Sequence, residues 1–183
     1  MKIVKIILIA LAILIAIVAI PLIAALFVNG EYAVEREVVI QKPKQEVFDY
    51  IKFLKNQNNY SVWNMKDPNS KMEYVGTDGT VGFIASWDSE NKEVGKGEQE
   101  IKKITEGERI DSELRFKISF ESTDNAFMTT EAIDSTQTKV KWGFNGKMPY
   151  PMNAMKLFMD MDKMLGPDLE AGLNNLKAVL EKK

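Results

Sequence analysis

The chain has 183 residues, a formal net charge of −2, no cysteine and no histidine. This composition excludes thiol nucleophiles, histidine-based acid–base catalysis and zinc sites built from imidazole or thiolate. Only carboxylates could hold a metal ion, and no EF-hand spacing occurs, so we predict neither a metal site nor a cofactor. No basic block or stripe of basic and aromatic residues is present, and nucleic acid is therefore not an expected partner.

The N-terminal region carries an uninterrupted apolar stretch at residues 6–28. A helix of this length is about 35 Å long, enough to cross a hydrocarbon core of about 30 Å. Lys2 and Lys5 precede the stretch and acidic residues predominate after it, so the positive-inside rule places the N-terminus in the cytoplasm. We predict a transmembrane anchor at residues 1–30 and one folded domain at residues 31–183.

A cleaved signal peptide is the alternative interpretation of this stretch. The apolar region of such a peptide is usually about 7–15 residues long and ends at a small-x-small cleavage site. Here the apolar run is longer, and it ends in Leu26-Phe27-Val28-Asn29, which is a poor cleavage site. The uncleaved anchor is therefore the favoured interpretation.

Most of the folded domain has the period-two hydrophobic pattern of antiparallel strands. One strand is expected at 33–41, and a helix follows from Pro43, where a missing N–H costs nothing. Asp124-Asn125 has the composition of a turn. The further expected strands cover residues 72–75, 83–87, 98–105, 109–121, 126–133 and 138–144. In the strand at 109–121, the residues expected to face inward are Ile110, Leu114, Phe116, Ile118 and Phe120.

The C-terminal segment from Tyr150 to Lys183 predicts one long helix that covers the apolar face of the sheet. Its second half has a regular leucine face at Leu169, Leu173, Leu176 and Leu180. Its first half is more apolar and carries methionines.

Two charged residues lie on faces that are otherwise apolar. Asp162 projects from the apolar arc of the C-terminal helix, and Arg36 shares the inward side of the strand at 33–41. A charge in an apolar interior is costly unless it is paired. We therefore predict that Asp162 lines the interior as its principal acidic group and that it pairs with Arg36 within about 4 Å. A structural ion pair or partial exposure of Asp162 is the alternative.

Several short motifs occur in a characteristic order: Val39-Ile40-x-x-Pro43-x-x-Val47-Phe48, Trp63 with Asp67-Pro68, Gly79-x-x-Gly82, Gly95-x-Gly97, and Gly166-Pro167-Asp168-Leu169-Glu170-x-Gly172-Leu173-x-x-Leu176-Lys177. Together they span nearly all of residues 33–182, and this order resembles the START-like superfamily, also called SRPBCC, in particular its bacterial polyketide cyclase-like branch. The resemblance implies an α+β helix-grip fold, in which a curved antiparallel sheet of about six or seven strands wraps a long C-terminal helix. It also implies a ligand cavity between the sheet and that helix.

From these features we expect a single-pass protein of the bacterial inner membrane with a periplasmic or extracellular domain. Its expected ligand is a hydrophobic or amphipathic small molecule, such as a lipid or isoprenoid. The alternatives are a cyclase or dehydratase acting on a polyketide-like compound, and a protein-interaction module with a filled cavity. The oligomeric state is not predicted. The candidate ligand-binding residues are Trp63, Trp87, Phe116, Met128, Trp142, Phe144, Met155, Phe158, Met159 and Asp162, with Arg36 as a polar partner.

Overall fold

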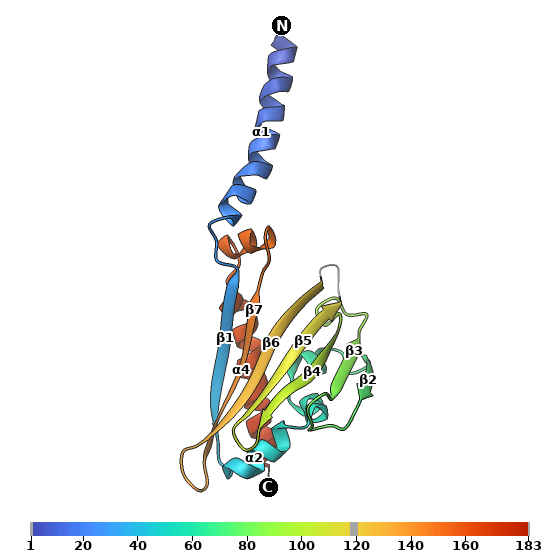
Figure 1. Cartoon of the computed structure of the whole chain (residues 1–183), viewed down its shortest axis with the longest axis vertical. Coiled ribbons are helices and arrows are strands. Elements are labelled where there is room, and N and C mark those ends of the chain that lie inside the picture. Colours follow the sequence, from blue (N-terminus) through green and yellow to red (C-terminus); the bar gives the residue numbers. More distant parts are fainter. Residues whose placement is uncertain (1, 118–120, 183) are drawn as a thin grey trace.

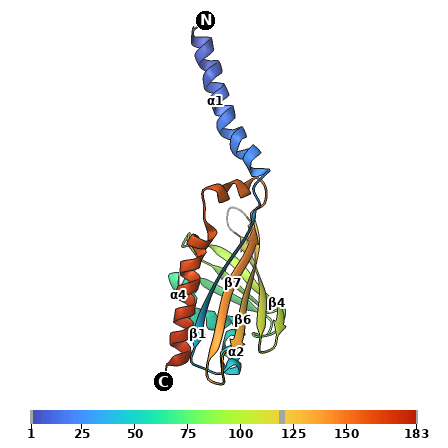
Figure 2. The same cartoon turned by 90° about the vertical axis from the view of Figure 1, so that its left-hand side faces the viewer.

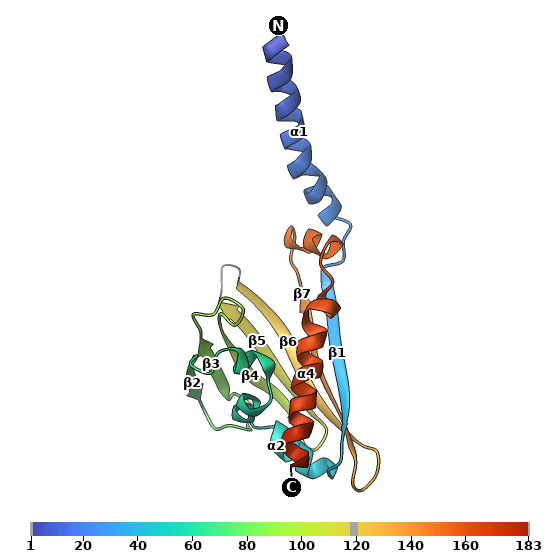
Figure 3. The same ribbon diagram turned by 180° about the vertical axis from the view of Figure 1, so that it is seen from behind.

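The structure, a computed structural model, describes residues 2–117 and 121–182. A long N-terminal helix, α1, projects from a domain in which a curled sheet packs against the C-terminal helix α4 (Figures 1 and 3). The elements in chain order are α1 (Lys2–Ala25), β1 (Glu31–Ile40), α2 (Lys44–Ile51), η1 (Leu54–Asn59), α3 (Val62–Lys66), β2 (Lys71–Val75), β3 (Ile84–Asp88), β4 (Lys96–Thr105), β5 (Arg109–Lys117), β6 (Glu121–Ala132), β7 (Thr138–Lys147), η2 (Met152–Leu157) and α4 (Met161–Glu181), where η marks a 3₁₀ helix.

The sheet has seven antiparallel strands in the order β1-β7-β6-β5-β4-β3-β2. From β2 to β7 each strand pairs with the next one in the chain, and β1 completes the sheet beside β7. Helix α4 runs alongside the edge strand β1 for the length of the curled sheet (Figure 2). The predicted α+β fold, with about seven strands wrapped on a C-terminal helix, is confirmed.

The two ends of the sheet are easily distinguished. At the end from which α1 projects, here called the α1 end, Glu31 pairs with Lys147. At the opposite end, here called the α2 end, Ile40 pairs with Thr138 and α2 lies nearby (Figure 1). The core here is fully packed, and its almost completely buried side chains include Ile40, Val47, Phe48, Ile51, Ile101, Val140, Leu173 and Leu176.

The C-terminal segment is not one continuous helix from Tyr150, as predicted, because it is divided into η2 and α4. Helix α4 begins at Met161, and the carboxylate of Asp160 accepts hydrogen bonds from the backbone N–H groups of Asp162 (3.1 Å) and Lys163 (3.3 Å). This N-cap satisfies donors that the first turn would otherwise leave unpaired. The leucine face of α4 is as predicted, with Leu169, Leu173 and Leu176 buried.

The predicted strand at 109–121 is confirmed at 109–117, but its predicted C-terminal end and the turn at Asp124-Asn125 are wrong. Strand β5 ends at Lys117 and β6 begins at Glu121, so Asp124 lies within β6 and pairs with Leu114. Asp-Asn favours turns locally, but the cross-strand ladder overrides that preference here. This difference places an acidic side chain inside the sheet.

Strand β5 has one buried face and one charged face, as its alternation predicts. Ile110 and Leu114 are buried, whereas on the outer face Arg115 forms an ion pair with Glu98 at 2.6 Å. Ile118 and Phe120, which were also predicted to face inward, lie outside the residues that the structure describes.

Candidate ligand-binding cavity

A cavity of about 650 Å³ lies between the sheet, α3 and the first turns of α4. This volume is within the range of about 300–1,000 Å³ that small-molecule sites usually have. Its walls are mostly apolar and aromatic. Five of the predicted ligand-binding residues line it, namely Trp63, Trp87, Phe116, Trp142 and Phe144.

Two groups of aromatic rings shape this cavity. Trp63 contacts Trp142 and Phe144 edge-to-face, with ring centroids 5.8 and 5.6 Å apart. Trp87 and Phe116 form a second such pair, with centroids 6.0 Å apart. Edge-to-face packing joins the positive edge of one ring to the negative face of the next, so each group is stable without a ligand between them.

Glycines on neighbouring elements make room for two of these tryptophans. A Cβ at Gly172 of α4 would lie 2.8 Å from a ring carbon of Trp142, and one at Gly97 would lie 2.6 Å from the ring of Trp87. The indole N–H of Trp87 also donates to the carbonyl of Val94 at 3.2 Å. The chain backbone therefore fixes how far both rings extend into the cavity.

The other predicted apolar residues do not line this cavity. Met128 lines a separate space of about 10 Å³, and its sulfur accepts a hydrogen bond from the Tyr60 hydroxyl at 3.5 Å. Met155, Phe158 and Met159 belong to η2 and the turn after it, at the α1 end. Phe158 is 87% exposed. The helical phase used to place them does not extend across the break before α4, because a 3₁₀ helix turns with a period of about 3.0 residues.

Asp162 forms the predicted ion pair with Arg36 but lies outside the cavity. The guanidinium donates to both carboxylate oxygens, at 2.7 and 2.8 Å, and these bonds lower the pKa of Asp162. The Asp162 side chain is 55% exposed. The guanidinium occupies the space beside Gly166, where a Cβ would collide with it. The pair closes the seam between α4 and edge strand β1, where solvent reaches it. The expectation that Asp162 is the principal acid of the interior is therefore wrong.

The buried acid of the cavity is Asp124, which the sequence analysis assigned to a turn. It is 8% exposed and lines the cavity wall. Asp124, Gly146 and Tyr32 lie in a row across β6, β7 and β1. A Cβ at Gly146 would collide with both the Tyr32 hydroxyl and an Asp124 carboxylate oxygen. The glycine therefore lets the Tyr32 ring cross the middle strand and reach the acid. A glycine inside a strand often marks such a close approach, and Gly146 is the sequence signal that could have identified this site.

Burial dominates the electrostatics of this pair. It raises the pKa of Asp124, and the nearby Tyr32 hydroxyl opposes that rise. Burial and the neighbouring carboxylate raise the pKa of Tyr32, so the phenol stays protonated and acts as a donor. A carboxylate accepts several hydrogen bonds, and Asp124 thus keeps acceptor capacity toward the cavity.

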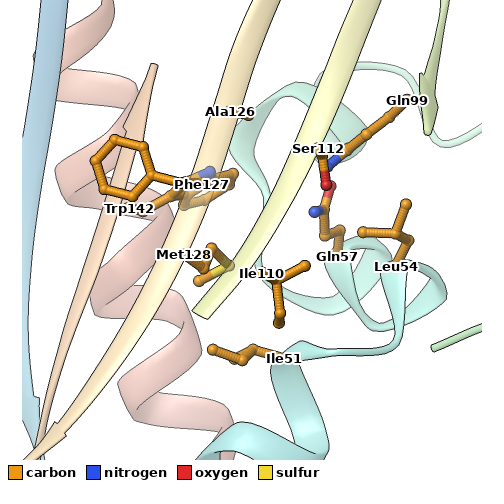
Figure 4. Close-up of a pocket in the computed structure, with 10 residues that line it drawn as sticks. All are labelled: Ile51, Leu54, Gln57, Gln99, Ile110, Ser112, Ala126, Phe127, Met128 and Trp142. Atoms are coloured by element: carbon orange, nitrogen blue, oxygen red, sulfur yellow. The ribbon is translucent and has the colours of Figure 1, made fainter. Parts of the chain in front are cut away.

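A second polar region, here called the polar floor, lies where the cavity approaches the packed core. It consists of Gln57, Gln99 and Ser112, whose side chains point toward one another (Figure 4). Gln57 and Gln99 line both the large cavity and the small space beyond it. The floor therefore separates the hollow α1 end from the packed α2 end.

The mouth of the cavity is at the α1 end. Its exposed lining residues include Pro68, Glu93 and Ser122. Asp67 accepts a hydrogen bond from the Ser89 hydroxyl at 2.5 Å, which lowers the pKa of Asp67 and joins two loops of the rim. Of the three acidic residues that line the described cavity, only Asp124 is buried.

Comparisons with known proteins give structural matches only. No family model matches the chain, and no curated protein matches its sequence. A norcoclaurine synthase mutant from Thalictrum flavum, solved with a transition-state analogue, has a TM-score of 0.59 at 10% identity, covering 83% of this chain and 95% of the enzyme. Ara h 8.0201 has a TM-score of 0.52 at 14% identity, covering 82% of this chain and 98% of its own.

A third similar structure is the Aha1 dimer from Colwellia psychrerythraea, with a TM-score of 0.55 at 11% identity over 82% of this chain and 96% of that one. At these identities the matches establish the fold alone. They do not distinguish the polyketide cyclase-like branch from others. The folded domain of this chain has the START-like (SRPBCC, or Bet v1-like) fold.

Proposed function

We propose that the protein is a membrane-anchored binding protein for an amphipathic small molecule, such as a lipid or isoprenoid. The observation that carries this proposal is the cavity of about 650 Å³, with aromatic walls and one buried acid. Removing an apolar ligand body from water is favourable by about 25 cal/mol per Å² of surface buried. The aromatic groups around Trp63 and Trp87 supply that environment.

The polar groups of the cavity suggest how such a ligand is oriented. Asp124 accepts hydrogen bonds near the mouth, and the amides of the polar floor lie at the deep end. A hydroxyl or amine at one end of the ligand would satisfy Asp124, whose neighbouring hydroxyl in the chain is that of Tyr32. The ligand class that fits best is therefore an apolar body with a hydrogen-bond donor at its head.

The cavity chemistry favours binding over catalysis. General acid–base catalysis usually needs two groups with pKa values set apart near the reacting atoms. Tyr32 is the neighbour of Asp124, and its raised pKa keeps the phenol protonated, so it is a weak acid and no phenolate is present at neutral pH to act as a base. The other two acidic lining residues, Asp67 and Glu93, lie at the rim.

The membrane part of the proposal rests on α1 and its attachment to the domain. Helix α1 is long and apolar enough to cross a membrane, and its most apolar window is fully exposed. A signal sequence can have the same length and apolar composition. The side chain of Asn153, however, donates to the carbonyls of Ala25 (2.7 Å) and Val28 (2.8 Å). Cleavage directly after α1 would remove the Ala25 carbonyl that Asn153 binds, which favours a retained anchor. Lys2 and Lys5 before α1 favour a cytoplasmic N-terminus.

Native mass spectrometry of the full chain, purified from its membranes and released from detergent micelles, tests the binding proposal. We expect a population that carries one extra small-molecule mass. Ala85 lines the cavity, so the ring introduced by Ala85→Phe should obstruct it and strongly reduce the population that carries the extra mass. Ser86→Phe is the matched control, because neighbouring strand residues point to opposite faces of the sheet. The proposal would be contradicted if the wild type carried no extra mass, or if Ala85→Phe and Ser86→Phe retained it to the same extent.

A further inference from the structure

A second apolar surface, separate from the cavity, lies at the α1 end. Its residues come from the stretch directly after α1 and from the segment around η2, two parts of the chain that are far apart in sequence. They are Leu26, Phe27, Tyr150, Met155, Leu157 and Phe158, and all are exposed. Phe27 and Phe158 are 85% and 87% exposed. Large side chains that gather on a surface in this way mark a contact with an apolar partner.

Hydrogen bonds hold these two stretches together. The buried Asn153 amide donates to the carbonyls of Ala25 and Val28, as described above. Lys156 donates from its ammonium group to the carbonyls of Asn29, at 2.9 Å, and Glu31. The carbonyls at a helix C-terminus lack intrahelical donors, and the Asn153 amide supplies one to the carbonyl of Ala25, the last residue of α1. Segment 150–159 is thus fixed across the end of α1, between that helix and the sheet (Figures 1 and 2).

The residue types in segment 150–159 fit a bilayer interface. Lys156 is its only charged residue, and its ammonium group is bound by backbone carbonyls. Tyrosine and lysine are favoured where a membrane helix leaves the hydrocarbon, since each combines an apolar body with a polar tip. Charged side chains resume at Glu31 and Asp160, on either side of this surface.

We propose that segment 150–159, together with Leu26 and Phe27, lies in the headgroup region of the bilayer that α1 crosses. This inference rests on the proposed retention of α1 as a transmembrane anchor. The partner is the lipid surface because the patch is continuous with the end of the span: Phe27 follows Ala25, the last residue of α1, by two positions. A transmembrane helix alone would let the domain tilt and rotate. The second contact fixes the domain so that its α1 end, with the cavity mouth, faces the membrane.

The absence of cysteine in the chain allows single labels to be introduced cleanly. The full chain would be reconstituted in phosphatidylethanolamine–phosphatidylglycerol vesicles with a bimane label at Phe158→Cys. References are Ile13→Cys within α1 and Thr136→Cys in the exposed loop at the α2 end. Lipids carrying a nitroxide at the headgroup or deep in the acyl chain serve as quenchers, and iodide reports exposure to water.

We expect the label at 158 to lose most of its emission to the headgroup quencher and less to the deep one. The label at 13 should be quenched by the deep nitroxide, and the label at 136 by iodide alone. Quenching at 13 with none by lipid at 158 would overturn this inference while leaving the anchor intact. Protection of 158 from both lipid and iodide would also overturn it, because a protein partner would then cover the patch. Iodide quenching at 13 would overturn the anchor and this inference together.

Discussion

The α2 end and the α1 end of the same sheet are packed differently. At the α2 end, mostly aliphatic side chains from α2, α4 and the strands fill the interior, and residues such as Ile40 and Val140 are completely buried. At the α1 end, aromatic rings contact one another in two groups and leave about 650 Å³ between them. Aliphatic interdigitation thus stabilises one end, whereas ring-to-ring packing keeps the other end open.

This difference in packing between the two ends shows how a small domain can hold a large cavity. Hydrophobic stabilisation scales with the apolar area removed from water, so a fully packed end contributes most of it. The polar floor of Gln57, Gln99 and Ser112 marks the boundary between the two ends. Beyond that boundary, the aromatic rings contact one another but leave the cavity of about 650 Å³ open.

The largest expected effect is the difference in stability lost when each of two leucines of α4 is replaced by alanine. Leu173 is 1% exposed and belongs to the packed end, whereas Leu165 is half-buried and lines the cavity. Leu173→Ala should lower the free energy of unfolding by about 2–5 kcal/mol. Leu165→Ala should cost only about 1 kcal/mol, because its side chain already borders open space. Denaturant unfolding of the full chain in mild detergent, followed by near-UV circular dichroism, measures both. Equal losses would show that the two ends are equally packed.

Replacement of the buried acid Asp124 should have an intermediate effect on the free energy of unfolding, and this effect should depend on pH. Burial raises the folded-state pKa of Asp124, so its protonated form favours folding. That stability is fully present below the unfolded pKa of about 3.9 and is lost as pH rises through the higher folded pKa. Asp124→Asn removes the charge and should be more stable than the wild type at neutral pH. The advantage should disappear in acid. Unfolding measured at several pH values tests this.

Asp67 at the cavity rim is the matched control, and it should show the opposite sign. The hydrogen bond from Ser89 lowers the pKa of Asp67, so its carboxylate stabilises the fold above the unfolded pKa. That contribution is lost as pH falls through the folded pKa. Asp67→Asn should therefore reduce stability at neutral pH and have no effect in strong acid. The same pH trend in both variants would contradict the contrast between the buried acid Asp124 and the rim acid Asp67.

The smallest effect is expected for the ion pair between Arg36 and Asp162, which belongs to neither end. Exposed pairs are screened by salt and contribute little to stability. In a double-mutant cycle with Arg36→Gln and Asp162→Asn, the coupling should be close to the measurement error and should shrink further in high salt. A large, salt-independent coupling would show that this seam is part of the core.

Much of the fold was predictable because it follows from periodic patterns. The alternation of apolar and polar residues predicted most strands. The three- and four-residue steps of Leu169, Leu173 and Leu176 predicted the buried face of α4. The pairing of Arg36 with Asp162 followed from two charges on apolar faces, and the bond lengths confirm it.

The acid of the cavity was not predictable from local pattern. Asp124-Asn125 has the composition of a turn, and only the ladder with β5 and β7 makes it part of a strand. Asp162 was misplaced for a related reason, since its predicted position assumed one helix from Tyr150. The N-cap at Asp160 begins a new helix, and the earlier helical phase does not apply to it. Tertiary pairing and helix boundaries are the information that periodicity lacks.

The most direct test of the account uses the three tryptophans of the chain, because all of them line the cavity. A long-chain brominated alcohol quenches indole fluorescence at contact, and it has the apolar body and donor head that the site should bind. In titrations of the full chain in micelles, we predict saturable quenching by one alcohol per chain. This component should be strongly weakened in Ala85→Phe, whose ring obstructs the cavity, and retained in Ser86→Phe. Non-saturable quenching that is equal in the wild type and both variants would contradict the claim that the hollow α1 end is a ligand site.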